Sequence, residues 1–309
     1  MATKNRTAFQ SQNLRGTVQI NPPTVIGSAF FVDSVNGSAN NSGSSWDNAF
    51  ATVDQAIAEC TAIKGDHIYA APWHVESESV SSASIFTMSK AGVSLIGITQ
   101  GRQRPTFTIS IADATATVSA ANCLIKNIKI VSAIEDLAVG LTLSAAADGT
   151  TVDGCILADG GTAILEMVLG ISIAAAAADI TINDNFFNTF AAGSGTLSAI
   201  KAVGAADRLW ITNNVFSGDW NTSACDLSTA ASLDIFVADN TIYNLDAAAG
   251  LAIDCNASTT GSIVRNLIFA GLNASAALVA AGCHACENYQ TTVEAESGNI
   301  VPVVGNWAA

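Results

Sequence analysis

The chain has 309 residues, of which half are apolar and 12% are charged, and its formal net charge is −14. This acidic balance argues against a nucleic acid or an anionic membrane surface as a partner. The most apolar window, residues 163–178, is interrupted by Glu166 and is too short to span a bilayer, so no membrane segment is expected. The polar N-terminus does not read as a signal peptide.

Residues 1–29 differ from the rest of the chain. They contain three basic residues, Lys4, Arg6 and Arg15, no acidic residue and a Pro22-Pro23 pair. We interpret them as an extended arm that binds a partner through these three cations. The alternative is a frayed terminus, or a strand along the side of the body.

Residues 30–309 are predicted to form one body, which opens with a strand at 30–33 and a helix at about 49–63. The apolar residues of the helix recur on one face: Phe50, Val53, Ala56, Ile57, Cys60 and Ile63. Asp47 or Asn48 is expected to cap its start, and Gly65 stands just past its end. We expect this helix to close one end of the body.

A repeat of 26 to 30 residues follows, from about residue 91 to residue 270. Each copy reads as a short alternating apolar stretch, an Ala-rich bend, a second such stretch, an Asn-type corner and another apolar pair, as in GISIAAAAADITINDNFF. This alternation is typical of strands. The corner residues are Asn127, Cys155, Asn185, Asn214, Asn240 and Asn266.

Three short strands per repeat, stacked in parallel, predict a right-handed parallel β-helix of about nine turns. Equivalent residues would then lie about 4.8 Å apart along the axis. The corner asparagines are expected to form a hydrogen-bonded structural ladder, interrupted at Cys155, since asparagine tolerates the left-handed conformation.

Charge and cysteine are unevenly distributed. Residues 1–130 have a net charge of +1 and residues 131–309 a net charge of −15. The near-neutral end is therefore the expected docking end, although an acidic surface also serves solubility. The seven cysteines are interpreted as buried apolar residues of a chain made in a reducing compartment. Cys283 and Cys286 have CxxC spacing, but no second pair accompanies them, so neither a metal nor a cofactor is expected.

The opening of the body resembles that of the pectin-lyase-like right-handed β-helix proteins of tailed bacteriophages. The matching residues are Gly43, Trp46, Ala49, Phe50, Thr52, Gly65, Asp66, Ile68, Tyr69 and Pro72. A glycine often follows that proline in these proteins, whereas this chain has Trp73. The resemblance implies the fold and a virion origin, but no particular role within the virion.

Two sets of residues are candidates for cleaving or binding a glycan. Asp184, Asp239 and Arg265 precede corner asparagines, and two carboxylates on one face are what a glycosidase or lyase uses. The structural alternative is that aspartates favour bends and pair with arginines on a surface. Trp220, in SGDWNTS, is the best candidate for an exposed glycan-binding aromatic residue.

We therefore expect a non-enzymatic virion protein, made in the bacterial cytoplasm, that decorates the capsid. Its expected partners are the major capsid protein or another virion protein, and copies of itself in a trimer. The alternative is a tail-associated spike that binds or cleaves a glycan.

Overall fold

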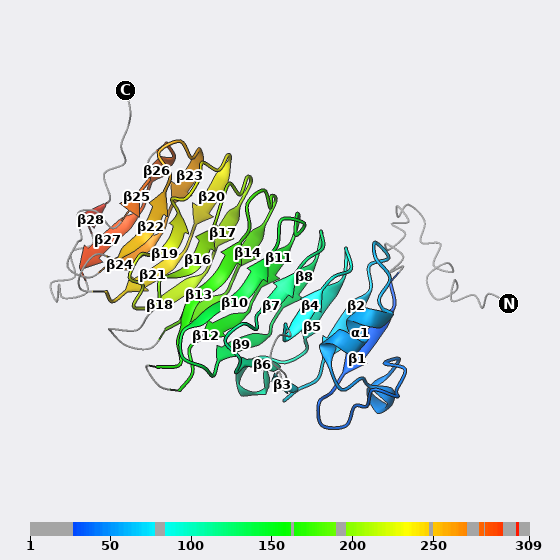
Figure 1. Cartoon of the computed structure of the whole chain (residues 1–309). Helices are drawn as coiled ribbons and strands as arrows, with labels where there is room; N and C mark the ends of the chain where they lie inside the picture. The colour runs from blue at the N-terminus through cyan, green and yellow to red at the C-terminus, as the bar shows by residue number, and fades with distance from the viewer. Residues whose placement is uncertain are drawn as a thin grey trace, which may run out of the picture.

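The computed structural model describes residues 27–77, 84–161, 164–189, 196–246, 250–270, 278–280, 282–292 and 301–302. Within them the chain winds into a solenoid whose turns add strands to three sheets in succession (Figure 1). The strand pairs are parallel, apart from the antiparallel pair of β27 with β28. The fold is therefore the predicted all-β right-handed parallel β-helix.

The sheets have ten, ten and eight strands. The first sheet contains β1 (Ala29–Val32), β2 (His67–Ala70), β5 (Ser94–Gly97), β8 (Leu124–Lys126), β11 (Thr151–Asp153), β14 (Thr181–Asn183), β17 (Trp210–Thr212), β20 (Ile235–Ala238), β23 (Gly261–Val264) and β26 (His284–Cys286). The second contains β3 (Val75–Ser77), β6 (Thr106–Ile109), β9 (Lys129–Ser132), β12 (Ile156–Ala158), β15 (Phe186–Asn188), β18 (Val215–Gly218), β21 (Thr241–Asn244), β24 (Leu267–Ala270), β27 (Tyr289–Thr292) and β28 (Val301–Pro302). The third contains β4 (Phe86–Met88), β7 (Ala116–Val118), β10 (Leu137–Leu143), β13 (Met167–Ile173), β16 (Ser198–Ala202), β19 (Ser223–Leu227), β22 (Leu251–Cys255) and β25 (Leu278–Val279).

The solenoid has about seven regular turns, slightly fewer than the nine predicted. The end turns are incomplete, because the third sheet has only eight strands and its last strand, β25, has two residues.

One apolar core runs the length of the solenoid. Strand register aligns the central residue of each strand in the first sheet, so that Ile125, Val152, Ile182 and Ile211 form an inward column. All four are fully buried. Each turn therefore completes the burial of the one before it, which explains why the apolar pattern repeats with the period of the turn.

The end of this core is covered by α1 (Val53–Glu59), at the blue end of Figure 1. The helix is shorter than the predicted 49–63, and Thr52 rather than Asp47 or Asn48 caps it, through a capping box with Gln55. Two short 3-10 turns also occur, η1 (Trp46–Asn48) and η2 (Gly101–Gln103). None of the helices in the described ranges is long and apolar enough to cross a membrane.

The predicted helix is too long at both ends for physical reasons. Phe50 is held extended by backbone hydrogen bonds with Phe31 and Asp33, and the chain leaves the helix at Cys60. Ile63, expected on the buried face, is instead 87% exposed. Its backbone N–H donates to the carbonyl of Ala91, and its φ is +64°.

Candidate functional site

The corner between the first and second sheets carries a continuous column of buried asparagines. The backbone N–H and the Nδ2 of Asn185 both donate to Oδ1 of Asn214, at 2.9 and 3.0 Å. The same pair of bonds links Asn214 to Asn240, Asn240 to Asn266, and Asn266 to Asn288. The column supplies partners for buried backbone donors and is a structural seam. Asn288 escaped prediction because only 22 residues separate it from Asn266.

Asn127 does not belong to this column, contrary to prediction. Strand register places Asn127 level with Gly154, and Ile128 level with Cys155. Asn127 therefore occupies the left-handed position that precedes the column, with φ of 58°, and its Nδ2 donates to the carbonyl of Gly97 at 2.6 Å. The ladder asparagines do not themselves have positive φ; the residue before each of them does.

Asp184, Asp239 and Arg265 lie at this left-handed position in different turns. The Arg265 guanidinium donates to both carboxylate oxygens of Asp239, at 2.7 Å each. These hydrogen bonds, with the positive charge, hold the pKa of Asp239 below its ordinary value. Arg208 likewise donates to both carboxylate oxygens of Asp179. The geometry favours an exposed ion pair over an acid–base couple, because the arginine fork occupies the carboxylate that would exchange a proton.

A different pair of carboxylates lies on the outer face of the third sheet. Asp226 and Asp254 are in register on the adjacent strands β19 and β22, which places their Cα atoms about 4.8 Å apart. The buried Asp226 accepts from Lys201 Nζ at 2.7 Å and from Ser228 Oγ at 2.6 Å. Sequence reasoning missed this pair, although Lys201, Asp226 and Asp254 fall on equivalent strands of three successive copies.

The surroundings shift the pKa values of the two carboxyl groups in opposite directions. Burial alone would raise the pKa of Asp226, but the hydrogen bonds from Lys201 and Ser228 hold it below its ordinary value. Burial and the neighbouring charge of Asp226 raise the pKa of Asp254. A carboxylate pair with separated pKa values is the arrangement that acid–base chemistry requires.

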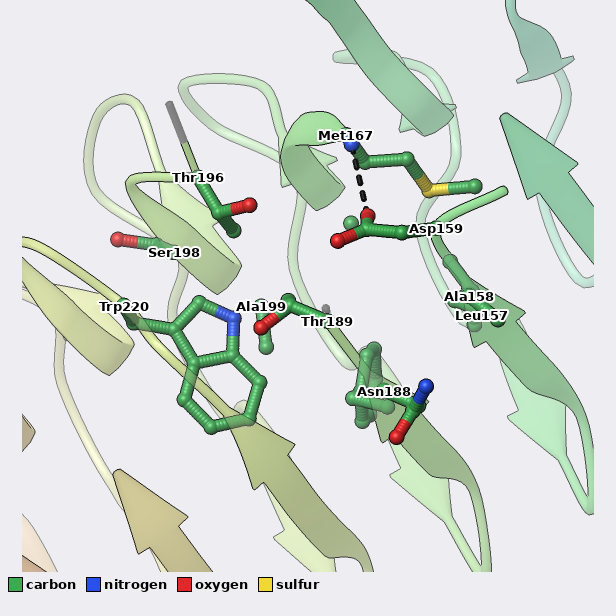
Figure 2. A pocket seen from close by; sticks show the side chains of 12 residues that line it. Leu157, Ala158, Asp159, Met167, Asn188, Thr189, Thr196, Ser198, Ala199 and Trp220 are labelled. Atoms are coloured by element: carbon green, nitrogen blue, oxygen red, sulfur yellow. Dashed lines mark hydrogen bonds between the residues drawn. The ribbon is translucent and has the colours of Figure 1, made fainter. Parts of the chain in front are cut away.

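Trp220 is fully buried, so its predicted role as an exposed glycan-binding residue is wrong. Its ring packs edge-on against Phe216, at 6.1 Å between ring centroids, and its backbone N–H donates to Asn244 Oδ1 at 3.0 Å. It lines a small pocket between the second and third sheets (Figure 2). Trp210 is the exposed tryptophan of this region, and it packs against Phe236 on the first sheet.

Asp66 anchors the chain where it enters the body. Its fully buried carboxylate accepts from the backbone N–H groups of Ser28 and Thr61 and lies 3.5 Å from Lys64 Nζ. Burial alone would raise the pKa of Asp66, but these bonds and the lysine charge hold it below its ordinary value. The basic residues of the predicted arm lie outside the described residues: Lys4, Arg6 and Arg15.

The same end of the solenoid exposes several large apolar side chains. Val35 is 74% exposed, Trp73 is 55% exposed, and Val75 also faces solvent, as does Ile63. Ile63 and Trp73 both have positive φ, which is costly for a residue with a Cβ and most of all for a β-branched one. Strain of this kind at exposed apolar residues points to a functional surface.

The cysteines are mostly core residues. Six are buried and only Cys286 is exposed. Burial raises the pKa of Cys155 to about 11 and that of Cys60 to about 12, so both remain thiols at neutral pH. In the part of the chain that the structure describes, no group of three or more histidine, cysteine or acidic residues is arranged to hold a metal ion.

Comparison with known proteins bears on the fold alone. No protein-family model matches the chain, and no curated protein matches its sequence. Among solved structures, it is similar to a rhamnogalacturonan lyase, with 12% sequence identity, a TM-score of 0.43 and coverage of 84% of each chain. The class that the structure defines is a parallel β-helix solenoid closed at one end by a helix.

Proposed function

We propose that this chain is a structural protein of a bacteriophage virion, which decorates the capsid and docks through its N-terminal end. The observation that carries the proposal is the uneven distribution of exposed apolar side chains. Among the described residues, four of the five most exposed large hydrophobic side chains lie within 27–77: Val35, Ile63, Trp73 and Val75. The resemblance of this segment to phage β-helix proteins supports the virion origin.

Charge favours the same orientation. The arm of residues 1–29 has three basic residues and no acidic one, and it enters the body at Ser28, beside Asp66. Residues 131–309 have a net charge of −15, which keeps the far end solvated. The N-terminal end thus combines apolar surface with the basic arm, and the acidic end points away from the shell.

The proposed partner is the major capsid protein or another virion protein, and the proposed assembly is a trimer. Exposed aromatic pairs on the flank support self-association, since Trp210 packs on Phe236 at 4.9 Å and both lie on the outer face of the first sheet. Light scattering on the purified full chain should give about three times the 31.5 kDa chain mass. A monomer at micromolar concentration would contradict the trimer without touching the docking proposal.

Docking is tested by adding purified protein to particles that lack it and measuring the bound fraction after sedimentation. Deletion of residues 1–26 leaves Ser28 and its bonds in place, so the body should fold and bind particles at least tenfold less well. Ile63→Asn removes apolar surface at a position whose left-handed backbone asparagine tolerates. Ile164→Asn also replaces an exposed isoleucine, but one far along the solenoid, so it is the control and should bind normally.

Normal loading of both the deletion and Ile63→Asn would refute docking through this end. An equal loss of particle binding in Ile63→Asn and Ile164→Asn would show that binding does not depend on the N-terminal end in particular, and would also contradict the proposal.

A glycan depolymerase is the second candidate function, and the Asp226–Asp254 pair is the observation that favours it. Asp254, with its raised pKa, would donate the proton, and the ionised Asp226 beside it would stabilise the positive charge that develops on the sugar ring. Incubation of wild type, Asp254→Asn and the control Asp184→Asn with host surface polysaccharide separates the two functions. Cleavage by wild type and Asp184→Asn but not by Asp254→Asn would favour the enzyme; no cleavage by wild type would remove it.

A further inference from the structure

The two cysteines with CxxC spacing, Cys283 and Cys286, face opposite sides of the solenoid wall. Cys283 is buried, whereas Cys286, the last residue of β26, is exposed. Side chains alternate along β26, with His284 and Cys286 exposed and Ala285 partly buried between them. A disulfide requires two Cβ atoms that point toward each other. The thiol of Cys283 is therefore directed into the core, away from Cys286.

A second cysteine faces the same end of the core from the preceding turn. Cys255 is the last residue of β22 and is buried. Strand register sets Asp254 level with Val279, which places Cys255 level with Ala280, and both contact the core. The backbone N–H of Cys283 donates to the carbonyl of Ala280 at 2.9 Å, so a tight turn returns the chain to the core. Figure 1 shows β22, β25 and β26 at the end of the solenoid opposite α1.

The two thiols are hydrogen-bonded to each other. Cys255 donates to the sulfur of Cys283, and Cys283 Sγ in turn donates to the carbonyl of Thr259 at 3.5 Å. The bond from Cys255 lowers the pKa of Cys283. The same bond, together with burial, raises the pKa of Cys255. Cys283 is thus the thiol that ionises first, and the thiolate is the form of cysteine that reacts with oxidants.

We propose that Cys255 and Cys283 are an oxidation site that forms a disulfide between successive turns, with hydrogen peroxide as the oxidant. The Cys283 thiolate attacks one peroxide oxygen, the O–O bond breaks and hydroxide leaves, which gives a sulfenic acid. The sulfur of Cys255 then attacks the Cys283 sulfur, and the departing hydroxide takes the proton of the Cys255 thiol. Two thiols and one hydrogen peroxide become one disulfide and two water molecules.

The disulfide would fasten the distal end of the solenoid. Cys283 follows Cys255 by 28 residues, so the bond closes a loop of that length between the turn of β22 and the turn of β26. The third-sheet strand between them, β25, has only two residues. Both thiols stay reduced in a reducing cytoplasm, and the bond forms once the chain leaves it. This inference goes beyond capsid docking and does not depend on it.

Peptide mapping of the purified full chain tests the bond. No lysine or arginine follows Arg265, so trypsin places Cys255 in peptide 209–265, with Cys225, and Cys283 in peptide 266–309, with Cys286. Native protein is treated with hydrogen peroxide, unfolded in iodoacetamide to block free thiols, and digested without reduction. Wild type should yield the two peptides linked, at least roughly tenfold above untreated protein, and dithiothreitol should separate them.

Variants assign the bond to its two cysteines. Cys255→Ala and Cys283→Ala should each abolish the linked pair. Cys225→Ala and Cys286→Ser remove the other cysteine of each peptide, so they are the controls and should give as much linked pair as wild type. If a variant with a buried substitution does not fold, fragmentation of the linked wild-type peptides by tandem mass spectrometry identifies the bonded residues directly.

Absence of the linked pair in peroxide-treated wild type would overturn the proposal. A bond mapped to Cys225 or Cys286, or a linked pair that persists in Cys283→Ala, would overturn it as well.

Discussion

Asn214 offers the sharpest test of the asparagine column. Its Oδ1 accepts from the backbone N–H and the Nδ2 of Asn185, and its own Nδ2 donates to Asn240 Oδ1 and to the carbonyl of Ile182. Asn214→Ala removes all four bonds in a fully buried corner. The Asn185 N–H is then orphaned, at about 1–3 kcal/mol, and each other lost bond contributes about 0.5–1.5 kcal/mol. We expect the free energy of unfolding to fall by about 3–5 kcal/mol, because these terms are not fully additive.

The assay is guanidinium unfolding followed by far-UV circular dichroism. Asn213→Gly is the matched control: Asn213 is exposed at the preceding corner position, with φ of 56°, and Gly154 already occupies that position in an earlier turn. This variant should lie within about 0.5 kcal/mol of wild type, since glycine adopts positive φ without strain. An Asn214→Ala protein that unfolds within about 1 kcal/mol of wild type would refute the reasoning.

Three further predictions concern single residues. Ile63→Asn should raise the free energy of unfolding by about 1 kcal/mol, because a strained left-handed isoleucine is replaced; a lower melting temperature would contradict this. Asp66→Asn should be clearly less stable than wild type at pH 7. Because the pKa of Asp66 is lowered in the folded protein, its contribution to stability is present above the unfolded pKa of about 4 and is lost as pH falls through the folded value. The free energies of unfolding of wild type and Asp66→Asn, plotted against pH, should therefore converge below about pH 4. A difference in stability that persists at about pH 2 would be evidence against the anchoring role of Asp66. Among the seven cysteines, Cys286 should react rapidly with a thiol reagent in the native protein and Cys155 should not, and Cys286→Ser should abolish the fast phase; an unchanged fast phase would mean that the core opens.

The solenoid was predictable because the residue pattern of the sequence repeats with the period of the turn. Each turn must bury the same face, so apolar residues and corner asparagines recur every 26 to 30 residues. The exact register was not predictable. Asn127 and Cys155 are 28 residues apart, within the range of the repeat, and only strand pairing shows that Ile128 is the residue level with Cys155.

The candidate sites were harder to predict, since they depend on contacts between turns. SGDWNTS is a polar segment, yet Trp220 within it is buried, with its ring against Phe216 and its backbone N–H bonded to Asn244 of the next turn. The sequence predicts that Asp239 and Arg265 lie in one column, because each precedes a corner asparagine. It indicates their ion pair only as the structural alternative to a catalytic role. Asp226 and Asp254 fall on equivalent strands, so aligning the copies by their third strand would have revealed them.

The most direct test of docking through the N-terminal end is electron cryo-microscopy of purified virions, at a resolution that traces the solenoid axis. We expect α1 and the surface formed by Val35, Ile63, Trp73 and Val75 to face the shell, while β26 and β27 lie at the distal end. Density that places β26 and β27 against the shell, or particles that lack the protein altogether, would contradict it.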